Sequence, residues 1–572
     1  MDKREISRIL EEIGLMLEIK GDNPFKIRAY VNGARILETL EGDLDDYIED
    51  GKVVGIKGIG DALSDKIIEL YKTGRLEYYE NLKSSIPSGL FDMLKIQGIG
   101  PKKVKVLYEK LGIETLGELE YACKENRLVE LDGFGEKTQN KILKGIQNIK
   151  KFTGQYLYGY VIEVAESIKN KLLQSSLVER CEVAGSLRRK KEVVKDIDIL
   201  ASSDEPSKLM DYFTTFEEID EVISKGETKT SVRLKLGIMM DLRVVEEHQF
   251  PYALHHFTGS KEHNTALRHR AKSLGIKINE YGLFRGDELI ACKDEQDIFR
   301  ALGLDNIPPE LRENMGEIEA AEKGKLPELV DARDLKGVLH IHTRYSDGSS
   351  DIAQMADMAK RMGFSYIGIS DHSRSAFYAK GLKEDDIKRQ VEEIDRYNAK
   401  SKDFKIFKGI ESDILPDGSL DYDEEILSLF DFVIASIHSN MGMEREKMTE
   451  RLINSVKNRY TTILGHMTAR ILLAREACDM DVYAVLDAAA ENETIIEINS
   501  DPQRLDLDWR YMKYAKAKGV RFAINPDAHS VGGLKNVIFG VGIARKGWLE
   551  ARDIINCMSF TELGDYFEKI RR

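Results

Sequence analysis

The sequence predicts a multidomain fold with three successive regions: a helical region, an α+β region and a parallel α/β barrel. Apolar residues recur at helical spacing from about residue 4 to 150, and β-strands join the helices from about 155 to 300. After residue 335, strand-like runs alternate with helical stretches, which is typical of a parallel β/α barrel. A chain of 572 residues is also long enough for several domains with separate cores.

Composition and charge limit which partners, which cysteine sites and which cellular location the protein can have. The formal net charge of −14 gives no global attraction to nucleic acid, so phosphate binding must come from local basic clusters and backbone amides. Five scattered cysteines without a Cys-x-x-Cys pair argue against a disulfide framework and against a thiolate zinc site. No apolar run approaches the roughly 18 residues that a membrane span needs. We therefore expect a cytoplasmic monomer with no membrane contact.

The helical region repeats one glycine pattern three times, at 56–60, 96–100 and 131–135. In each copy two glycines permit a tight turn that opens a helix and leaves backbone N–H groups free for phosphate. Three copies favour DNA-backbone binding over the alternative that the glycines serve only helix packing. The copies resemble helix-hairpin-helix motifs, and the glycines expected at the DNA are Gly58, Gly60, Gly98, Gly100, Gly133 and Gly135.

Three aspartates in the α+β region form the first candidate catalytic site. Asp196 and Asp198 alternate on a strand-like run, so both carboxylates lie on one face, and Asp241 lies in a later apolar strand. An isolated Asp-x-Asp pair is more often solvated surface. Three converging carboxylates instead need cations, and two Mg²⁺ ions about 4 Å apart organise in-line attack at phosphorus.

The surroundings of these aspartates resemble the nucleotidyltransferase superfamily and, more narrowly, a family X DNA polymerase. Gly185-Ser186 and a basic cluster precede Asp-x-Asp, and Phe257-Thr258-Gly259-Ser260 matches the family's thumb. The resemblance implies that Asp196 and Asp198 bind both metal ions and that Asp241 assists the primer 3′-hydroxyl. It implies that the deoxynucleoside triphosphate contacts Gly185, Ser186, Arg189, His256, Gly259, Asn264 and Arg268. His256 replaces the tyrosine that packs beneath the sugar in vertebrate repair enzymes, so ribose discrimination stays open.

The same resemblance assigns expectations to the helical region. Lys66 stands at the position of the family's Schiff-base lysine, which removes a 5′-deoxyribose phosphate. Val54 and Ala62 replace other lysines of that pocket, so lyase activity stays open beside the alternative of a solvated surface lysine. The family's hairpins also bind K⁺ or Na⁺ through carbonyls that correspond to Val54, Ile56, Ile59, Leu94, Ile96 and Ile99.

Histidines and carboxylates form the second candidate site, at the ends of strand-like runs. His340 and His342 alternate on a strand, so both imidazoles project from one side near its C-terminal end. A single histidine in such a run is usually a core residue, but here His, Asp and Glu recur at one strand end after another. The six strand-like runs lie at 337–340, 366–369, 432–435, 462–464, 495–498 and 521–524.

These motifs resemble the polymerase and histidinol phosphatase (PHP) domain, a distorted (β/α)7-type barrel, throughout residues 335 to 572. By that resemblance, one metal ion binds His340, His342, Glu411 and Asp527, and Glu411 bridges to a second ion at His438 and His466. A third ion binds Asp347, His372 and His529. The mixture of imidazole and carboxylate ligands suits Mn²⁺ or Zn²⁺.

These observations predict six segments and a repair enzyme. The segments are a helical lyase-like domain (1–84), a helix-hairpin-helix subdomain (85–154), a nucleotidyltransferase palm (155–248), a thumb (249–316), a linker (317–334) and a PHP domain (335–572). We expect a polymerase that fills short gaps in primed DNA, with a 3′–5′ exonuclease; cleavage at abasic sites or 3′-blocked ends stays open. The alternatives are a DNA-binding adaptor with vestigial catalysis and a small-molecule phosphatase.

Overall fold

The computed structural model describes residues 1–571 except 2, 41–43, 50–52, 54, 55, 57, 97, 130 and 151–153. The chain forms two compact units, Met1–Ile149 and Lys150–Arg572, which are described separately. Within the described residues, none of the helices is both long and apolar enough to span a membrane.

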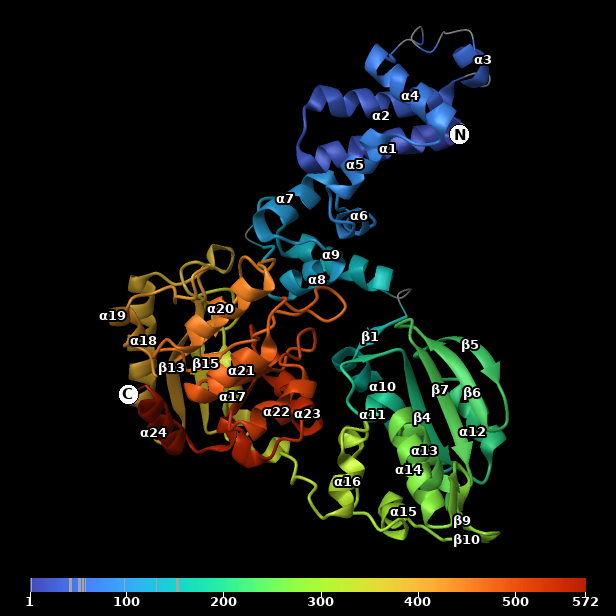
Figure 1. Cartoon of the computed structure of the whole chain (residues 1–572), viewed down its shortest axis with the longest axis vertical. Helices are drawn as coiled ribbons and strands as arrows, with labels where there is room; N and C mark the ends of the chain where they lie inside the picture. The colour runs from blue at the N-terminus through green and yellow to red at the C-terminus, as the bar shows by residue number, and fades with distance from the viewer. Residues whose placement is uncertain are drawn as a thin grey trace. The chain divides into compact units, whose positions relative to one another are not determined.

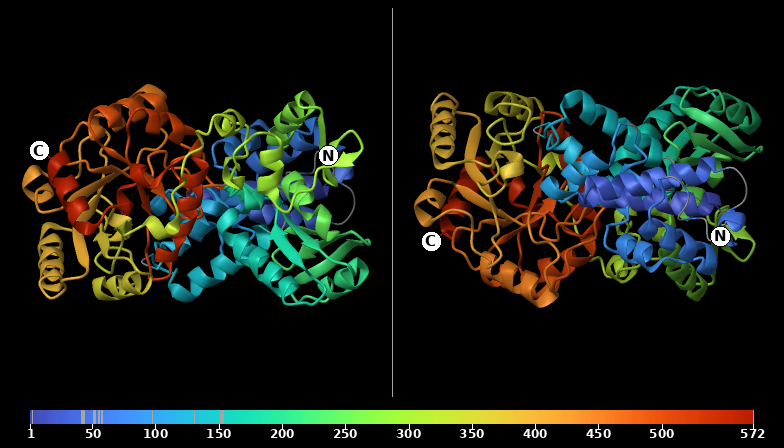
Figure 2. Two further views of the ribbon diagram at one scale, coloured as in Figure 1. Left: turned by 90° about the horizontal axis from the view of Figure 1, so that it is seen from below. Right: turned by 90° about the horizontal axis from the view of Figure 1, so that it is seen from above.

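The first unit is helical. Its longest helices, α1 (Lys3–Lys20) and α2 (Pro24–Thr39), lie side by side (Figure 2). The apolar face of α1 predicted by helical spacing, including Ile6, Leu10 and Ile13, is buried in the core of this unit. The remaining helices are α3 (Leu44–Glu49), α4 (Asp61–Thr73), α5 (Glu77–Ser84), α6 (Gly89–Met93), α7 (Pro101–Leu111), α8 (Leu116–Lys124) and α9 (Glu136–Lys150).

The second unit begins with a five-stranded mixed sheet in the order β2-β4-β7-β6-β5. The second strand, β4 (Asp196–Ser202), and the central strand, β7 (Met239–Val245), are parallel neighbours, which places their first residues at the same end of the sheet. The other strands are β2 (Arg180–Val183), β5 (Ile219–Lys225) and β6 (Lys229–Leu234). Helices α10 (Tyr158–Leu173), α11 (Gly185–Arg188) and α12 (Pro206–Phe213) accompany them, and β1 (Tyr156–Leu157) pairs with β3 (Val193–Val194).

A thumb follows this sheet, with its own hydrophobic core. It contains α13 (Phe250–Thr258), α14 (Lys261–Ser273), β8 (Ile276–Asn279), β9 (Gly282–Arg285), β10 (Glu288–Leu289) and α15 (Glu295–Ala301). Part of the expected linker belongs to the thumb as well. Helix α16 (Glu317–Glu322) buries Ile318 and Ala321 in the thumb core, whereas Val330 packs into the core of the barrel that follows.

The rest of the chain is a seven-stranded parallel sheet in sequence order, which confirms the predicted α/β barrel. The strands are β11 (Gly337–Ile341), β12 (Tyr366–Ile369), β13 (Lys405–Asp413), β14 (Phe432–Ser436), β15 (Ile463–Leu464), β16 (Ile495–Asn499) and β17 (Phe522–Asn525). A parallel bridge between Ile341 and Ala528, next to β17, nearly closes the sheet on itself. Helices α17 (Ile352–Arg361), α18 (Glu384–Asn398), α19 (Glu424–Leu427), α20 (Arg445–Val456), α21 (Val482–Glu491), α22 (Trp509–Ala517) and α23 (Val537–Lys546) surround it (Figure 1).

The last helix, α24 (Phe560–Ile570), covers the N-terminal end of the barrel (Figure 1). Its Phe567 ring lies 5.7 Å from that of Phe432 and 5.8 Å from that of Phe407, at the starts of their strands. Apolar side chains fill this end of the barrel. The C-terminal end of the strands is therefore the end at which a polar site can open.

Candidate active sites

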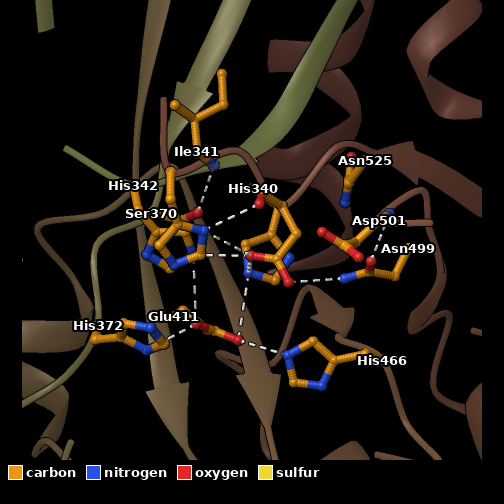
Figure 3. Close-up of polar contacts among 12 residues, drawn as sticks. His340, Ile341, His342, Ser370, His372, Glu411, His466, Asn499, Asp501 and Asn525 are labelled. Carbon is orange, nitrogen blue, oxygen red and sulfur yellow. Dashed lines mark hydrogen bonds and ion pairs between the residues drawn. The ribbon is translucent and has the colours of Figure 1, made fainter. Parts of the chain in front are cut away.

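The C-terminal ends of the barrel strands bring all nine predicted metal ligands together. They form overlapping groups whose ligand atoms lie within 4.8 Å of one another: His340, His342, Asp347, His372, Glu411, His438, His466, Asp527 and His529. Figure 3 shows the imidazoles of His340, His342, His372 and His466 around the Glu411 carboxylate. The alternation along each strand and the parallel register explain this convergence, because every strand delivers its polar residues to the same edge.

Glu411 lies at the centre of the cluster. One carboxylate oxygen lies 2.9 Å from His466 Nε2 and 3.3 Å from both His340 Nε2 and His438 Nε2. The other oxygen lies 2.9 Å from His372 Nδ1. Because both oxygens face imidazoles on different strands, a single carboxylate connects the separate ligand groups.

The donor atoms suit divalent cations. Among the described residues, Nε2 of His340 and both ring nitrogens of His342 make no properly oriented hydrogen bond. Both Nε2 atoms nevertheless lie 3.2 to 3.6 Å from oxygens of Glu411 and Asp527. Buried lone pairs that face one another across such distances are stabilised when a cation lies between them.

The pKa shifts divide the ligands into two groups. Burial raises the pKa of Glu411, but the charges of His438, His340 and His372 outweigh burial and hold its pKa well below the usual range. Burial and the neighbouring His529 lower the pKa of His342 to about 3, and burial and Arg504 lower that of His466 to about 4. The ionised Glu411 and the neutral His342 and His466 are thus already in the forms that bind metal ions. Burial lowers the pKa of His340, His372 and His438, but the neighbouring carboxylates outweigh burial and raise it, so these three imidazoles must release a proton when a cation binds.

A second layer of carboxylates and amides, missed by the sequence analysis, orients the ligands. His340 Nδ1 lies 2.5 Å from Glu497 Oε1, and His438 Nδ1 lies 2.6 Å from Asp413 Oδ1. Glu497 also accepts hydrogen bonds from Asn525 Nδ2 and from the His466 main-chain N–H. Such partners fix which ring nitrogen faces the metal ion. Glu497 could have been identified from the sequence, because it is a charged residue inside the apolar run 495–498.

Three ligands have a left-handed backbone: His340 (φ 58°), His466 (φ 22°) and Asp527 (φ 50°). A non-glycine residue adopts this conformation at a cost of about 1–2 kcal/mol. The hydrogen bonds and packing around the strand ends maintain it.

The polymerase-type aspartates lie on neighbouring strands of the five-stranded sheet. Asp198 on β4 is paired in register with Asp241 on β7, and Asp196 precedes Asp198 on the same face. Burial, followed by the charges of Asp196 and Asp241, raises the pKa of Asp198 to about 6. The three carboxylates therefore repel one another, which is the electrostatic condition for cation binding.

Asp241 has a cationic partner that the sequence analysis did not identify. Lys229 Nζ on β6 lies 2.7 Å from Asp241 Oδ2, and Ser231 Oγ donates to Asp241 Oδ1 at 2.6 Å. Among the described residues, the three aspartates do not form a compact ligand group like those of the barrel. Lys229 neutralises part of the negative charge that they share.

Gly185 brings the start of α11 against Asp198. Its φ is +62°, and a Cβ atom built on it would lie 2.4 Å from Asp198 Oδ2, so only glycine fits here. Beside it, Arg189 is held by the thumb: its Nε donates to Glu313 Oε1 at 3.1 Å, and its guanidinium also donates to the carbonyl of Thr258.

Three further predicted nucleotide-binding residues, His256, Asn264 and Arg268, line one small cavity between α13 and α14. Asn264 Nδ2 donates to the His256 carbonyl at 2.8 Å, which joins the two helices. Gly259, also predicted, lies at the junction of these helices with φ +70°, and an added Cβ would lie 3.0 Å from Arg189 Nη1. Ser186 lies in α11, directly after Gly185.

The glycine hairpins of the first unit have the predicted turn geometry. Gly58, Gly98 and Gly133 have φ values of +101°, +90° and +83°, which favour glycine. Gly60 and Gly100 are the N-cap residues of α4 and α7, and Gly135 directly precedes α9. A Cβ built on Gly60, Gly98, Gly100, Gly133 or Gly135 would meet no atom within 4 Å, so packing within the protein does not require these glycines.

The predicted carbonyl sites lie in the turns before these helices. The carbonyls of Ile56 and Ile96 accept hydrogen bonds from the N–H groups of Ile59 and Ile99, each at 3.0 Å. Leu94 lies just after α6, and Val54 lies outside the described residues.

Lys66, the predicted lyase residue, is half-buried on α4. Its Nζ donates to the Ala62 carbonyl at 3.2 Å and lies 5.4 Å from the centre of the Tyr78 ring. Lys26 Nζ lies 5.5 Å from the same ring. The structure therefore places the amines of Lys26 and Lys66 near one half-buried tyrosine ring.

Comparison with known proteins gives matches to every part of the chain. Family models match residues 1–76 (helix-hairpin-helix domain), 91–148 (SAM-like helix-hairpin-helix tandem), 253–313 (DNA polymerase beta thumb) and 339–501 (PHP domain). The DNA polymerase/3′-5′ exonuclease PolX of Bacillus subtilis (strain 168) is 36% identical over 573 residues, covering 100% of both chains.

Two further relatives each match one part of the chain. DNA polymerase lambda of Rattus norvegicus is 21% identical over 331 residues, which cover 52% of this chain and 54% of its own. A probable phosphatase of Caldanaerobacter subterraneus subsp. tengcongensis is 33% identical over 207 residues, which cover 33% of this chain and 74% of its own.

Proposed function

The chain belongs to the family X DNA polymerases that carry a PHP domain, and from that premise we propose which of its residues perform two reactions on DNA. It is a DNA polymerase that fills gaps in repair and a 3′–5′ exonuclease. The observation that carries the second activity is the convergence of nine metal-binding side chains on Glu411. Divalent cations and DNA with deoxynucleoside triphosphates are the corresponding cofactors and substrates.

For synthesis, Asp196, Asp198 and Asp241 hold a pair of Mg²⁺ ions, which supply the charge that organises in-line attack at phosphorus. Burial and the repulsion from Asp196 and Asp241 raise the Asp198 pKa to about 6, which supports this assignment. Asp241 assists the primer 3′-hydroxyl, while Lys229 balances the shared negative charge. The triphosphate is bound by Gly185, Ser186 and Arg189, and the nascent pair lies along Gly259, His256, Asn264 and Arg268.

For degradation, the barrel cluster would hold up to three Mn²⁺ or Zn²⁺ ions, whose charge would lower the pKa of a bound water and neutralise a phosphodiester. Glu411 connects the groups, while Asp413 and Glu497 hold the His438 and His340 rings in place. Cleavage at an internal abasic site or removal of a 3′-blocking group is also attack on a phosphate ester, and we extend the proposal to both.

For DNA binding, the glycine hairpins hold the sugar-phosphate backbone through helix N-termini, with K⁺ or Na⁺ at the turn carbonyls. The open space beside Gly60, Gly100 and Gly135 supports this proposal. Lys66 is the proposed lyase nucleophile, which borohydride trapping on a 5′-deoxyribose phosphate end would test. We retain the six domain segments predicted from the sequence, with α16 assigned to the thumb, and we propose that the protein acts as a monomer.

The decisive experiment follows a labelled primer in a gapped duplex. With Mg²⁺ and deoxynucleotides the primer should lengthen, and with Mn²⁺ alone it should shorten from its 3′ end. Binding without either change would favour the adaptor. Hydrolysis of histidinol phosphate with intact DNA would favour the small-molecule phosphatase.

A further inference from the structure

Two aromatic side chains stand beside the metal-ligand cluster, in the loop after β12. The ring centre of Tyr378 lies 6.2 Å from that of His372 and 6.4 Å from that of His438, so Tyr378 borders the cluster. The ring of Phe377 lies 5.9 Å from that of Tyr378 at an interplanar angle of 77°. Phe377 is 75% exposed, whereas His372 is only 2% exposed. The pair thus leads from solvent to the ligands.

The loop holds this pair in a fixed position. The Ser375 N–H and hydroxyl both donate to the Asp421 carboxylate at 2.6 Å, and the Arg374 N–H donates to the Tyr422 hydroxyl at 2.9 Å. Asp421 and Tyr422 are themselves buried.

The backbone on the other side of the loop is equally constrained. Leu382 N–H donates to the His372 carbonyl at 2.8 Å, and a Cβ built on Gly381 would lie 1.8 Å from the Ser373 carbonyl oxygen. The loop is therefore closed tightly against the strand ends, and the exposure of Phe377 is a property of the fold.

An exposed phenylalanine gains nothing in folding, since burying such a side chain contributes about 1.5–3 kcal/mol. Charge around the pair indicates what covers it. Arg374 and Lys380, both exposed, flank Phe377 and Tyr378 in the same loop. Exposed aromatic rings between basic side chains are the combination that binds single-stranded nucleic acid, because the rings stack on bases while the cations follow the phosphates.

We infer that Phe377 and Tyr378 form a base-stacking platform for the unpaired 3′-terminal nucleotides of DNA. This inference rests on the proposed exonuclease and assigns to Phe377 and Tyr378 the positioning of its substrate's 3′ end. The ligands His340, His342 and Glu411 are at most 1% exposed, so a substrate needs a contact that guides its phosphodiester from the surface to the cluster. Stacking on Phe377 would align the last bases with Tyr378 and place their phosphodiester at the cluster.

Fluorescence tests the platform without catalysis. The full-length protein, stripped of metal ions by a chelator, is titrated into an oligonucleotide with 2-aminopurine at its 3′ end. Stacking should quench the fluorescence, and Phe377→Ala should weaken the apparent affinity roughly tenfold, as expected for the loss of one base stack. Phe377→Trp should restore binding. Tyr483→Ala is the matched control, because Tyr483 is an exposed aromatic residue of the barrel that packs on Tyr511 and Tyr514 instead.

The same variants are then compared as exonucleases with Mn²⁺ on a single-stranded tail and on a paired end. Phe377→Ala should raise KM for the tail about tenfold while kcat changes little, with an unchanged thermal unfolding curve. Unchanged KM and quenching in an active Phe377→Ala enzyme would overturn the platform alone. If wild-type protein degrades no DNA, the exonuclease proposal fails, whereas quenching still reports on the platform. If Phe377→Ala changed only the self-association of the protein, Phe377 would be a contact between protein molecules, and this result would also overturn the base-stacking platform.

Discussion

Lys546, in the last turn of α23 of the barrel, forms an ion pair with Glu313 of the thumb. The Lys546 ammonium is fully buried and also donates to the Arg189 carbonyl at 3.1 Å. Glu313 in turn accepts a hydrogen bond from the Arg189 guanidinium. One carboxylate therefore joins the PHP barrel to the residue that we propose binds the triphosphate.

Lys546→Met should destabilise the second unit, because it removes the cation of a buried ion pair. The Glu313 carboxylate then has Arg189 but no longer Lys546 to balance its negative charge. We expect a loss of about 3 kcal/mol in the free energy of unfolding, measured by urea denaturation. The KM for deoxynucleotides should rise as Arg189 loses its support. The exposed Lys535→Met serves as control. Equal stability of both variants would show that the pair contributes nothing.

Asp198→Ala should abolish primer extension while exonuclease activity persists, because it removes a central carboxylate from only one of the two sites. A labelled gapped duplex measures both activities in one assay. Asp204→Ala, at an exposed aspartate in the loop after β4, should leave extension intact. Extension at the wild-type rate by Asp198→Ala would remove this residue from the polymerase site.

Glu411→Gln should lower exonuclease activity roughly a hundredfold, because the amide keeps the shape of the side chain but loses the charge that several imidazoles share. Elemental analysis should find fewer bound transition metal ions, and the far-ultraviolet circular dichroism spectrum should not change. Primer extension should continue. The exposed Glu424→Gln is the control, and undiminished degradation by Glu411→Gln would refute the assignment.

Asp413→Asn should weaken metal binding about ten- to hundredfold, because Asp413 orients His438 without belonging to the predicted ligands. Titration with Mn²⁺ should show activity that returns at high concentration, as a positioning role requires. A variant that stays inactive at saturating Mn²⁺ would show that Asp413 does more than orient its histidine. Asp417→Asn, at an exposed aspartate of the same domain, should behave as wild type.

The stability of the thumb should depend on pH through Glu295. Burial raises the pKa of Glu295, but Arg312 and Arg188, whose guanidinium groups pair with it, outweigh burial and hold it well below the usual range. A depressed pKa contributes stability that is present above the unfolded value of about 4.3 and is lost as pH falls further.

At pH 7 the free energy of unfolding of Glu295→Gln should therefore be about 3 kcal/mol lower than that of wild type. This difference between the two proteins should decrease as pH falls from 5 to 3. Urea denaturation at several pH values measures the gap. Glu288→Gln, at an exposed glutamate of β10, should show no such trend. A gap that is constant with pH would contradict the linkage.

Local patterns predicted much of this fold and of the barrel site. Most strand-like runs after residue 335 became strands within a residue or two, because buried parallel strands read as short apolar runs. Strand β13 was not predicted, although it contains Glu411, because its polar residues Lys405, Lys408 and Asp413 interrupt the apolar pattern.

Other features depend on partners that no local pattern reveals. Composition predicted a linker at 317–334, yet Glu317 is fully buried against His263, with their side chains 2.7 Å apart. Glu497 looked like part of an apolar strand until the fold placed it beside His340. Lys546 and Glu313 are separated by 233 residues, so only the folded chain shows that they meet.

The left-handed backbone at His340, His466 and Asp527 should affect how the site changes during evolution. Hydrogen bonds and packing at the strand ends maintain this unfavourable conformation, and only metal binding requires histidine or aspartate at these positions. In a lineage that had lost nuclease activity, selection would no longer oppose glycine or asparagine at these three positions, and both residues adopt this conformation more readily. Replacement should therefore begin at these positions and reach His342 or His438 later. Among relatives without nuclease activity, the strained positions should therefore be substituted more often than the unstrained ligand positions.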